Sequence, residues 1–230
     1  MGVDLMSAAF WLAAFQIIVI NILLSGDNAV VIALACRNLP PNQQRWGIIW
    51  GAVGAIALRI ILTFFAVTLL SLPWLKLVGG VLLIWIGVKL IADEEDDGHE
   101  VKASDKLLAA VWTIIVADLV MSIDNVLGVA AAAKGSLFLL IFGLVISIPI
   151  VIAGSQIIMR LVERFPLLVV AGGGLLGYVA AEMMIEDPVV VDWVNAQGAW
   201  IRWVAPIAGI VIVIGIAQWL KSRSRNAESA

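Results

Sequence analysis

The run LLAAVWTIIVADLVMSIDNVLGVAAAA, residues 107–133, decides the fold class of this chain. A helix needs roughly 20 apolar residues to cross the hydrocarbon core of a bilayer, and this run exceeds that length. Its only ionisable side chains are Asp118 and Asp124. The run therefore predicts a membrane-spanning helix that holds two carboxyl groups inside the bilayer.

The composition of the whole chain agrees with this run. Of its 230 residues, 63% are hydrophobic and 13% are charged, against roughly 25% charged in a typical soluble domain. The net charge of -3 gives no support for a nucleic-acid partner, and the single Cys36 excludes an intramolecular disulfide. We therefore predict an integral membrane protein whose main contact is with the lipid bilayer.

Similar apolar runs recur between short polar breaks, and they predict seven transmembrane helices in an all-α fold. The predicted spans are 9–35, 46–71, 74–92, 107–133, 136–159, 166–186 and 201–220. Because the breaks are short, we expect residues 1–230 to form a single transmembrane domain. The N-terminus lacks the basic segment and cleavage site of a signal peptide, so the first span is expected to be retained.

The distribution of basic residues predicts the orientation. An odd number of spans puts the termini on opposite sides of the membrane, and cytoplasmic loops carry an excess of Lys and Arg. The side that holds the C-terminus has ten of these residues, whereas the other side has three. We therefore expect a multi-pass protein of the plasma membrane with its N-terminus outside and its C-terminus in the cytoplasm.

The first and fourth predicted spans carry the same polar pattern at an offset of 97 residues. Its members are Asn21, Ser25, Asp27 and Asn28 in the first span and Asp118, Ser122, Asp124 and Asn125 in the fourth. Residues 73–89 also align with 166–182 at an offset of 93. Because each unit has three spans, the pattern predicts two inverted repeats, 9–92 and 107–186, followed by an extra helix at 201–220.

These polar positions predict a binding site for a cation. A charged carboxylate in mid-membrane costs about 2.5–3.5 kcal/mol to insert, so a compensating ligand is expected. Carboxylate, amide and hydroxyl oxygens suit Mn²⁺, Mg²⁺ and Ca²⁺, and no His or Cys stands beside them to favour zinc or copper. The candidate metal ligands are Asp27, Asn28, Asp124, Asn125, Asp118, Ser25 and Ser122. The alternative is that the polar side chains only join helices through hydrogen bonds.

Three further residues are candidates for a gate or a counter-ion. Arg59, in the middle of the second span, would balance one of the aspartates. Glu182 is either a ligand at an outer gate or an interfacial residue, and Asn21 belongs to the polar pattern of the first span. The acidic segment 93–105, which holds His99, is expected to be a solvated cytoplasmic loop or a weak collector of cations.

The doubled motif resembles that of the TerC family of integral membrane proteins, and in particular its YjbE-like branch. The residues that carry the resemblance are Ser25-Gly-Asp27-Asn28 and Ser122-Ile-Asp124-Asn125. The resemblance implies a fold related to the LysE-type exporter superfamily, and it implies efflux of manganese or a related divalent metal. It also implies that Asp27, Asn28, Asp124 and Asn125 form the binding motif.

The intramembrane carboxylates therefore predict a secondary transporter of a divalent cation that works by exchange for protons, and the resemblance implies export with Mn²⁺ as the first candidate. Neither an enzyme nor a bound cofactor is expected, because no Walker motif, zinc-protease motif or Ser-His-Asp arrangement is present. Two alternatives remain. One is an exporter of a small organic solute such as an amino acid; the other is a membrane scaffold that supports metal supply to exported proteins. The sequence does not indicate an oligomeric state.

Overall fold

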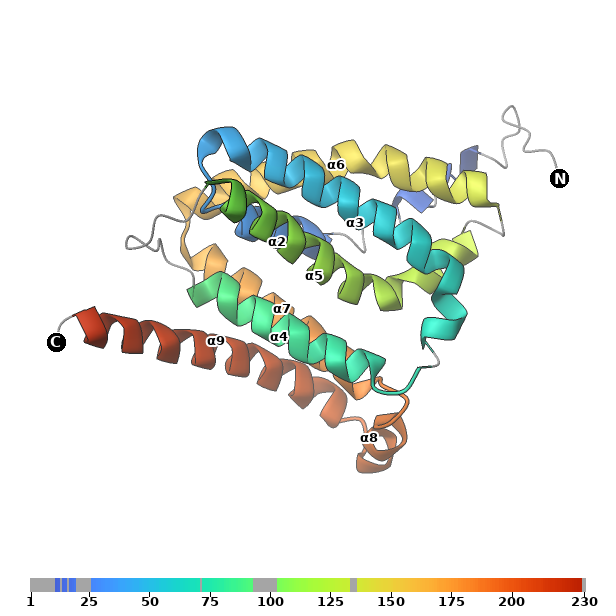
Figure 1. The fold of residues 1–230 in the computed structure, drawn as a ribbon. Coiled ribbons are helices and arrows are strands. Elements are labelled where there is room, and N and C mark those ends of the chain that lie inside the picture. Colours follow the sequence, from blue (N-terminus) through green and yellow to red (C-terminus); the bar gives the residue numbers. More distant parts are fainter. Residues whose placement is uncertain are drawn as a thin grey trace. The chain divides into compact units, whose positions relative to one another are not determined.

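The computed structural model describes residues 11–12, 14–15, 17–19, 26–70, 72–92, 103–132 and 136–228. Side chains are described for these residues except 66–70, 103, 124–132, 137, 139 and 224–228. Within this part of the chain every regular element is a helix (Figure 1). The helices are α2 (Gly26–Cys36), α3 (Pro41–Leu70), α4 (Leu75–Ala92), α5 (Ala103–Ala132), α6 (Leu137–Arg164), α7 (Leu167–Ile185), α8 (Val191–Gln197) and α9 (Ile201–Glu228).

Six of the described helices are long and apolar enough to cross a membrane. They are α3, α4, α5, α6, α7 and α9, and they correspond to the last six predicted spans. The all-helical membrane fold is thereby confirmed. The first predicted span, 9–35, lies partly outside the described residues. Helix α2, which covers its described C-terminal part, is a shorter apolar helix, so the count of seven stays a prediction.

Several boundaries differ from the predicted ones. Residues 103–105 belong to the first turn of α5, whereas 93–102 of the predicted acidic loop lie outside the described residues. Helices α6 and α9 continue past the predicted ends at 159 and 220 into Arg- and Lys-containing segments. Helix α8, a short helix before α9, was not predicted. Apolar runs locate the membrane part of a helix, whereas a polar continuation carries no such signal.

The chain divides into two compact units. Unit 1 comprises Met1–Leu70 and Leu107–Met159, and unit 2 comprises Ser71–Lys106 and Arg160–Ala230. Each predicted repeat therefore contributes its first two spans to unit 1 and its third span to unit 2. The inverted relation between the repeats remains a prediction.

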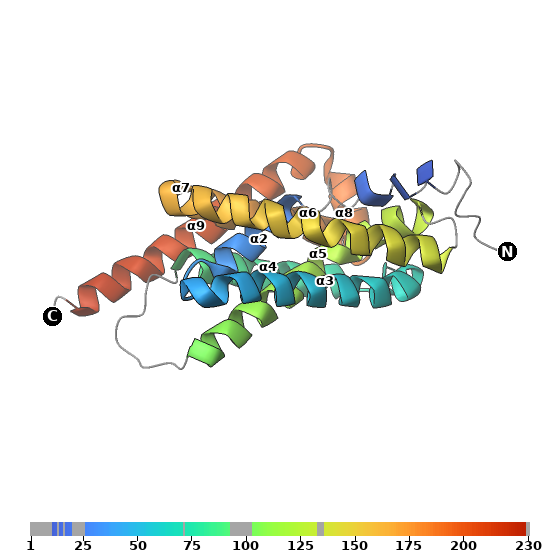
Figure 2. The same ribbon diagram turned by 90° about the horizontal axis from the view of Figure 1, so that it is seen from above.

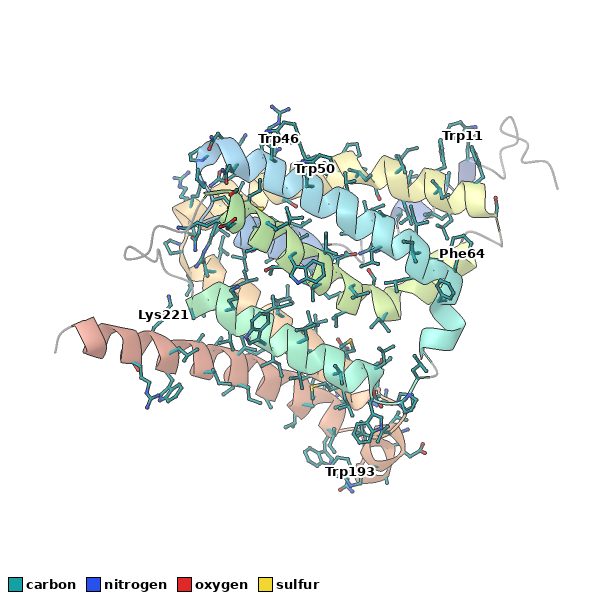
Figure 3. All side chains as sticks on the ribbon, viewed as in Figure 1. Trp11, Trp46, Trp50, Phe64, Trp193 and Lys221 are labelled. Carbon is teal, nitrogen blue, oxygen red and sulfur yellow. The ribbon has the colours of Figure 1, made fainter. Side chains whose placement is uncertain are left out.

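The core of unit 1 is built from four helices. Ile32 and Ala33 of α2, Ile48 of α3, Ile114 of α5 and Val151 of α6 belong to one cluster of buried side chains. A second cluster joins α3 to α6, which run alongside each other in both views (Figures 1 and 2). Trp46 and Trp50 lie on the outer side of α3 and are more than half exposed, as expected for side chains that face lipid (Figure 3).

In unit 2, three long helices, α4, α7 and α9, pack pairwise against one another, and the short α8 precedes α9 (Figure 1). Val88 of α4, Val213 and Ala217 of α9 and Val170 of α7 form its apolar contacts. The backbones of α7 and α9 approach closely where glycines face each other. A Cβ atom on Gly177 would overlap the carbonyl group of Gly209.

This close approach predicts a large difference between two glycine-to-alanine substitutions. Gly177→Ala should destabilise unit 2 by about 1–3 kcal/mol, because the added methyl forces α7 and α9 apart. Gly215→Ala, on α9, is the matched control, since no described atom beyond its chain neighbours and the local backbone of α9 lies within 4 Å of the position of its Cβ. Melting temperatures of the purified variants in detergent measure the effect. Equal melting temperatures would show that the helices accommodate the methyl group without cost.

Candidate functional site

Three helices of unit 1 bring polar side chains together in an otherwise apolar interior. Helix α2 contributes Asn28, α3 contributes Arg59, and α5 contributes Asp118 and Ser122. All four side chains are buried, with exposed fractions of 5%, 2%, 6% and 0% in that order. Because Asp118 and Ser122 are four residues apart, they lie on the same face of α5, one turn from each other.

The carboxylate of Asp118 is the centre of this cluster. Its Oδ1 accepts hydrogen bonds from Asn28 Nδ2, at 2.8 Å, and from Arg59 Nη2, with which it forms an ion pair. Its Oδ2 accepts a hydrogen bond from Ser122 Oγ at 3.1 Å. That hydroxyl in turn accepts a hydrogen bond from Arg59 Nε at 2.9 Å. Arg59 and Ser122 together therefore engage both oxygens of the carboxylate.

The amide of Asn28 has an unusual environment. Its Nδ2 faces a carboxylate, which only accepts hydrogen bonds, so the orientation of the amide is determined by Asp118. Its Oδ1 is buried and has no hydrogen-bond donor among the described residues. Asn28, Arg59 and Asp118 line a cavity of about 10 Å³ whose remaining walls are apolar side chains of α2, α3 and α6. A cavity of that size holds about one water-sized atom.

Asp27 lies beside this cluster on the first turn of α2. Its side chain is partly buried, and its Oδ1 accepts a hydrogen bond from the backbone amide of Asn28 at 2.8 Å. It lies within electrostatic range of both Arg59 and Asp118. Two intramembrane aspartates and one arginine are thus placed within reach of one another.

Four predicted site residues cannot be placed in this cluster. Asn21 and Ser25 lie outside the described residues, and the side chains of Asp124 and Asn125 lie outside the described side chains of α5. Within the described part of the chain, no three side chains of His, Cys, Asp or Glu lie close enough to hold a metal ion. The structure therefore brings together four predicted site residues, Asn28, Arg59, Asp118 and Ser122, with Asp27 next to them.

Comparison with known proteins places the chain in a family. The model of the Integral membrane protein TerC family matches residues 6–225, nearly the whole sequence. The chain belongs to the TerC family. It is thus a multi-pass integral membrane protein, and the family predicted from the doubled Asp-Asn motif is confirmed.

Several relatives match the sequence of this chain along most of their length. The uncharacterized membrane protein YjbE of Bacillus subtilis is 41% identical over 205 residues, which cover 89% of this chain and 93% of YjbE. The uncharacterized membrane protein YceF of the same species is 26% identical over 182 residues, covering 75% and 70%. The UPF0053 inner membrane protein YgdQ of Escherichia coli is 26% identical over 174 residues, covering 68% and 73%. No solved structure matches this TerC-family chain.

Glu182, a candidate gate residue, lies on α7 in unit 2 of the TerC-family protein, and its side chain is exposed. A neighbouring acid that sequence reasoning missed is more deeply buried. Asp187, in the segment after α7, has an exposed fraction of 0%. Its carboxylate accepts hydrogen bonds from the backbone amides of Trp74, Lys76, Leu77 and Val189, at 2.9–3.2 Å.

Asp187 therefore caps the N-terminus of α4 from a distant part of the chain. The first amides of a helix have no partner within the helix, and a carboxylate placed there satisfies them and interacts favourably with the helix dipole. One of the amides belongs to Trp74, whose φ of 69° lies in the left-handed region that favours glycine. Lys76 adds an ion pair with Glu186, at 3.2 Å. Asp187 thus holds a strained turn and joins α4 to α7.

This cap predicts a pH-dependent contribution to stability. Burial alone would raise the pKa of Asp187, but the four backbone hydrogen bonds outweigh it and lower the pKa below its ordinary value of 3.8. A lowered folded-state pKa stabilises the fold above the unfolded-state pKa, and this stabilisation is lost as the pH falls through the folded-state value. Asp187→Asn should therefore lower the free energy of unfolding by about 1.5–3 kcal/mol at pH 7, and the difference should shrink below about pH 4.

Asp192→Asn provides the matched control, because Asp192 is an exposed acid in the first turn of α8. Denaturant titrations in mixed micelles at pH 7 and at pH 3 measure both variants. A loss of stability in Asp187→Asn that is the same at both pH values would rule out the carboxylate as the cause.

Proposed function

We propose that this TerC-family protein is a secondary transporter of the plasma membrane that exports a divalent metal cation, most favourably Mn²⁺, in exchange for protons. The transported cation binds at the cluster of Asn28, Asp118 and Ser122, with Asp27 beside it. The predicted motif residues Asp124 and Asn125, on the same helix as Asp118, complete the set of oxygen ligands. The N-terminus faces outward and the C-terminus lies in the cytoplasm.

The observation that carries this proposal is the side-chain carbonyl oxygen of Asn28, which lies next to the Asp118 carboxylate and lacks a hydrogen-bond donor within the described part of the chain. An unpaired buried polar atom is costly, so its presence in a folded protein calls for an explanation, and a bound ion is one that fits this site. A carboxylate and a carbonyl oxygen beside one small cavity are the ligands that a hard divalent cation requires. A hydrogen-bonded contact between helices would not need an acceptor that is left without a donor.

The size of the cavity supports an ion over an organic solute. A volume of about 10 Å³ suits one atom-sized ligand, whereas small organic ligands occupy clefts of roughly 300–1,000 Å³. The guanidinium of Arg59, the group that would bind a carboxylate of an amino acid, already engages Asp118 and Ser122. Both observations favour the metal cation over the alternative substrate.

The charge of the substrate supports exchange with protons. Moving a divalent cation out of a negative interior costs about 4.6 kcal/mol per 100 mV, twice the cost for a single charge. Exchange for two protons cancels that electrical cost. Carboxylates that bind either a cation or protons provide such an exchange, and the predicted spans hold three, Asp27, Asp118 and Asp124, of which two suffice to carry two protons.

The test is the metal content of cells with and without the chain, measured for Mn, Fe, Co, Ni, Zn, Ca and Mg in parallel. Cells that express the protein should contain less Mn than control cells after exposure to excess Mn²⁺. Asp118→Asn should behave as the empty control, whereas Asp105→Asn, an exposed acid in the first turn of the same helix, should behave as the wild type. Unchanged content of every metal would refute metal export.

A further inference from the structure

Arg59 already forms an ion pair with Asp118, the carboxylate that the proposed substrate would bind. Arg59 Nη2 pairs with Asp118 Oδ1, and Arg59 Nε reaches Asp118 Oδ2 through the hydroxyl of Ser122. Both members of the ion pair are buried, so water screens the interaction little. A divalent cation that binds Asp118 must therefore compete with the guanidinium for the same oxygens.

Arg59 differs from a free competing ion because it is covalently attached to the backbone. Arg59 lies near the middle of α3, and its side chain is among the largest that are fully buried. Arginine stays charged under all physiological conditions, so the guanidinium does not lose its charge as the pH changes. Unlike a dissolved ion, it cannot leave, and it returns to Asp118 whenever the substrate departs.

We propose that Arg59 is the resident cation of the transport site, a tethered competitor that weakens substrate binding and drives substrate release. This inference rests on the proposed function and adds its regulation. The resident cation keeps Asp118 neutralised inside the membrane between substrates, which lowers the cost of a buried carboxylate. It also prevents the site from holding a divalent cation so tightly that turnover stops.

Removal of the resident cation should tighten binding and slow transport. Arg59→Gln removes a like charge from the site and keeps a hydrogen-bonding side chain, so the Kd for Mn²⁺ should fall by about tenfold or more. Because release becomes slower, kcat for Mn²⁺ flux should fall together with KM. Arg59→Lys keeps the charge but loses the forked geometry, so its Kd should lie between those of Arg59→Gln and the wild type. Arg160→Gln, at an exposed arginine of α6, is the matched control.

The experiment uses Mn²⁺ itself as the probe. Binding to the purified full-length chain in detergent is followed by the electron paramagnetic resonance signal of free Mn²⁺, and flux is measured in proteoliposomes. A purely structural role for Arg59 would lower stability without a change in Kd. Under the resident-cation mechanism, Mn²⁺ instead raises the melting temperature of Arg59→Gln more than that of the wild type.

The outcomes separate the two proposals. Wild-type protein that neither binds nor moves Mn²⁺ would overturn the proposed function, and the resident cation with it. Wild-type protein that transports Mn²⁺, together with Arg59 variants of unchanged or weaker affinity, would overturn the resident cation alone. If Arg59→Gln does not fold, Arg59→Lys decides, because its Kd must still fall below the wild-type value.

Discussion

Asp118→Leu is expected to lower the free energy of unfolding by about 3–5 kcal/mol and to abolish metal efflux. The substitution leaves the buried guanidinium of Arg59 without its Asp118 counter-ion, and breaking a buried ion pair from one side carries a penalty of that size. It also removes the central acceptor of the hydrogen bonds from Asn28 and Ser122. Denaturant titration in mixed micelles and Mn²⁺ flux in proteoliposomes measure the two effects.

The double variant Arg59→Met/Asp118→Leu separates stability from function. An apolar pair of similar volume avoids the buried charge, so the double variant should be more stable than Asp118→Leu alone by several kcal/mol. It should still transport no Mn²⁺, because the carboxylate is missing. Recovery of flux in the stable double variant would show that the ion pair serves only to join α3 to α5.

Asp27→Asn is expected to reduce Mn²⁺ flux by at least about 100-fold with little loss of stability. Asparagine is nearly isosteric and can accept the hydrogen bond from the Asn28 amide, so the local fold of α2 should persist. The substitution removes the charge that would bind a cation beside Asp118. In a poorly hydrated site such a loss weakens cation binding by several kcal/mol, which corresponds to a factor of at least about 100. The flux assay and a melting curve of the same preparation report both quantities.

Asp105→Asn again serves as the control, because Asp105 is exposed in the first turn of α5. Its flux should equal that of the wild type, since exposed charges contribute little and are screened by salt. Wild-type flux in Asp27→Asn would remove Asp27 from the site and leave Asp118 and Asp124 as the candidate carboxylates.

Much of this fold could be predicted from the sequence because the bilayer imposes strict rules. Backbone groups in hydrocarbon must form their hydrogen bonds within their own segment, so an apolar run long enough to cross the membrane is expected to form a helix. Six of the predicted spans follow from this rule. This rule does not apply to the polar ends of α6 and α9 or to the short helix α8, because a backbone in water can adopt many conformations.

The candidate site could be predicted in part. Asp118 and Arg59 could be identified because a charged side chain within an apolar run is costly to insert into a membrane. Such a side chain can be recognised from the sequence alone. Which aspartate faces Arg59 depends on how α3 rotates against α5, and the sequence contains no local signal for that rotation. The unpartnered carbonyl of Asn28 likewise becomes visible only when the neighbours of its amide are known.

Asp187 shows why some residues escape sequence reasoning. It lies between Glu186 and Pro188 at the end of an apolar run, where acidic residues are usually solvated. Its partners at the start of α4 are more than a hundred residues away in the sequence. The strained backbone of Trp74 could not be predicted from the sequence either, because left-handed backbone dihedrals are normally expected at glycine or asparagine. Only the fold brings these two features together.

The most direct test of metal export by the buried carboxylates is Mn²⁺ flux in proteoliposomes under an imposed pH gradient, with the membrane voltage clamped separately. A pH gradient should drive Mn²⁺ across the membrane in wild-type vesicles, imposed voltage should change the rate little, and Asp27→Asn and Asp118→Asn vesicles should match empty ones. Wild-type vesicles that move no Mn²⁺ under the gradient, or mutant vesicles that move it at the wild-type rate, would contradict metal export by these carboxylates.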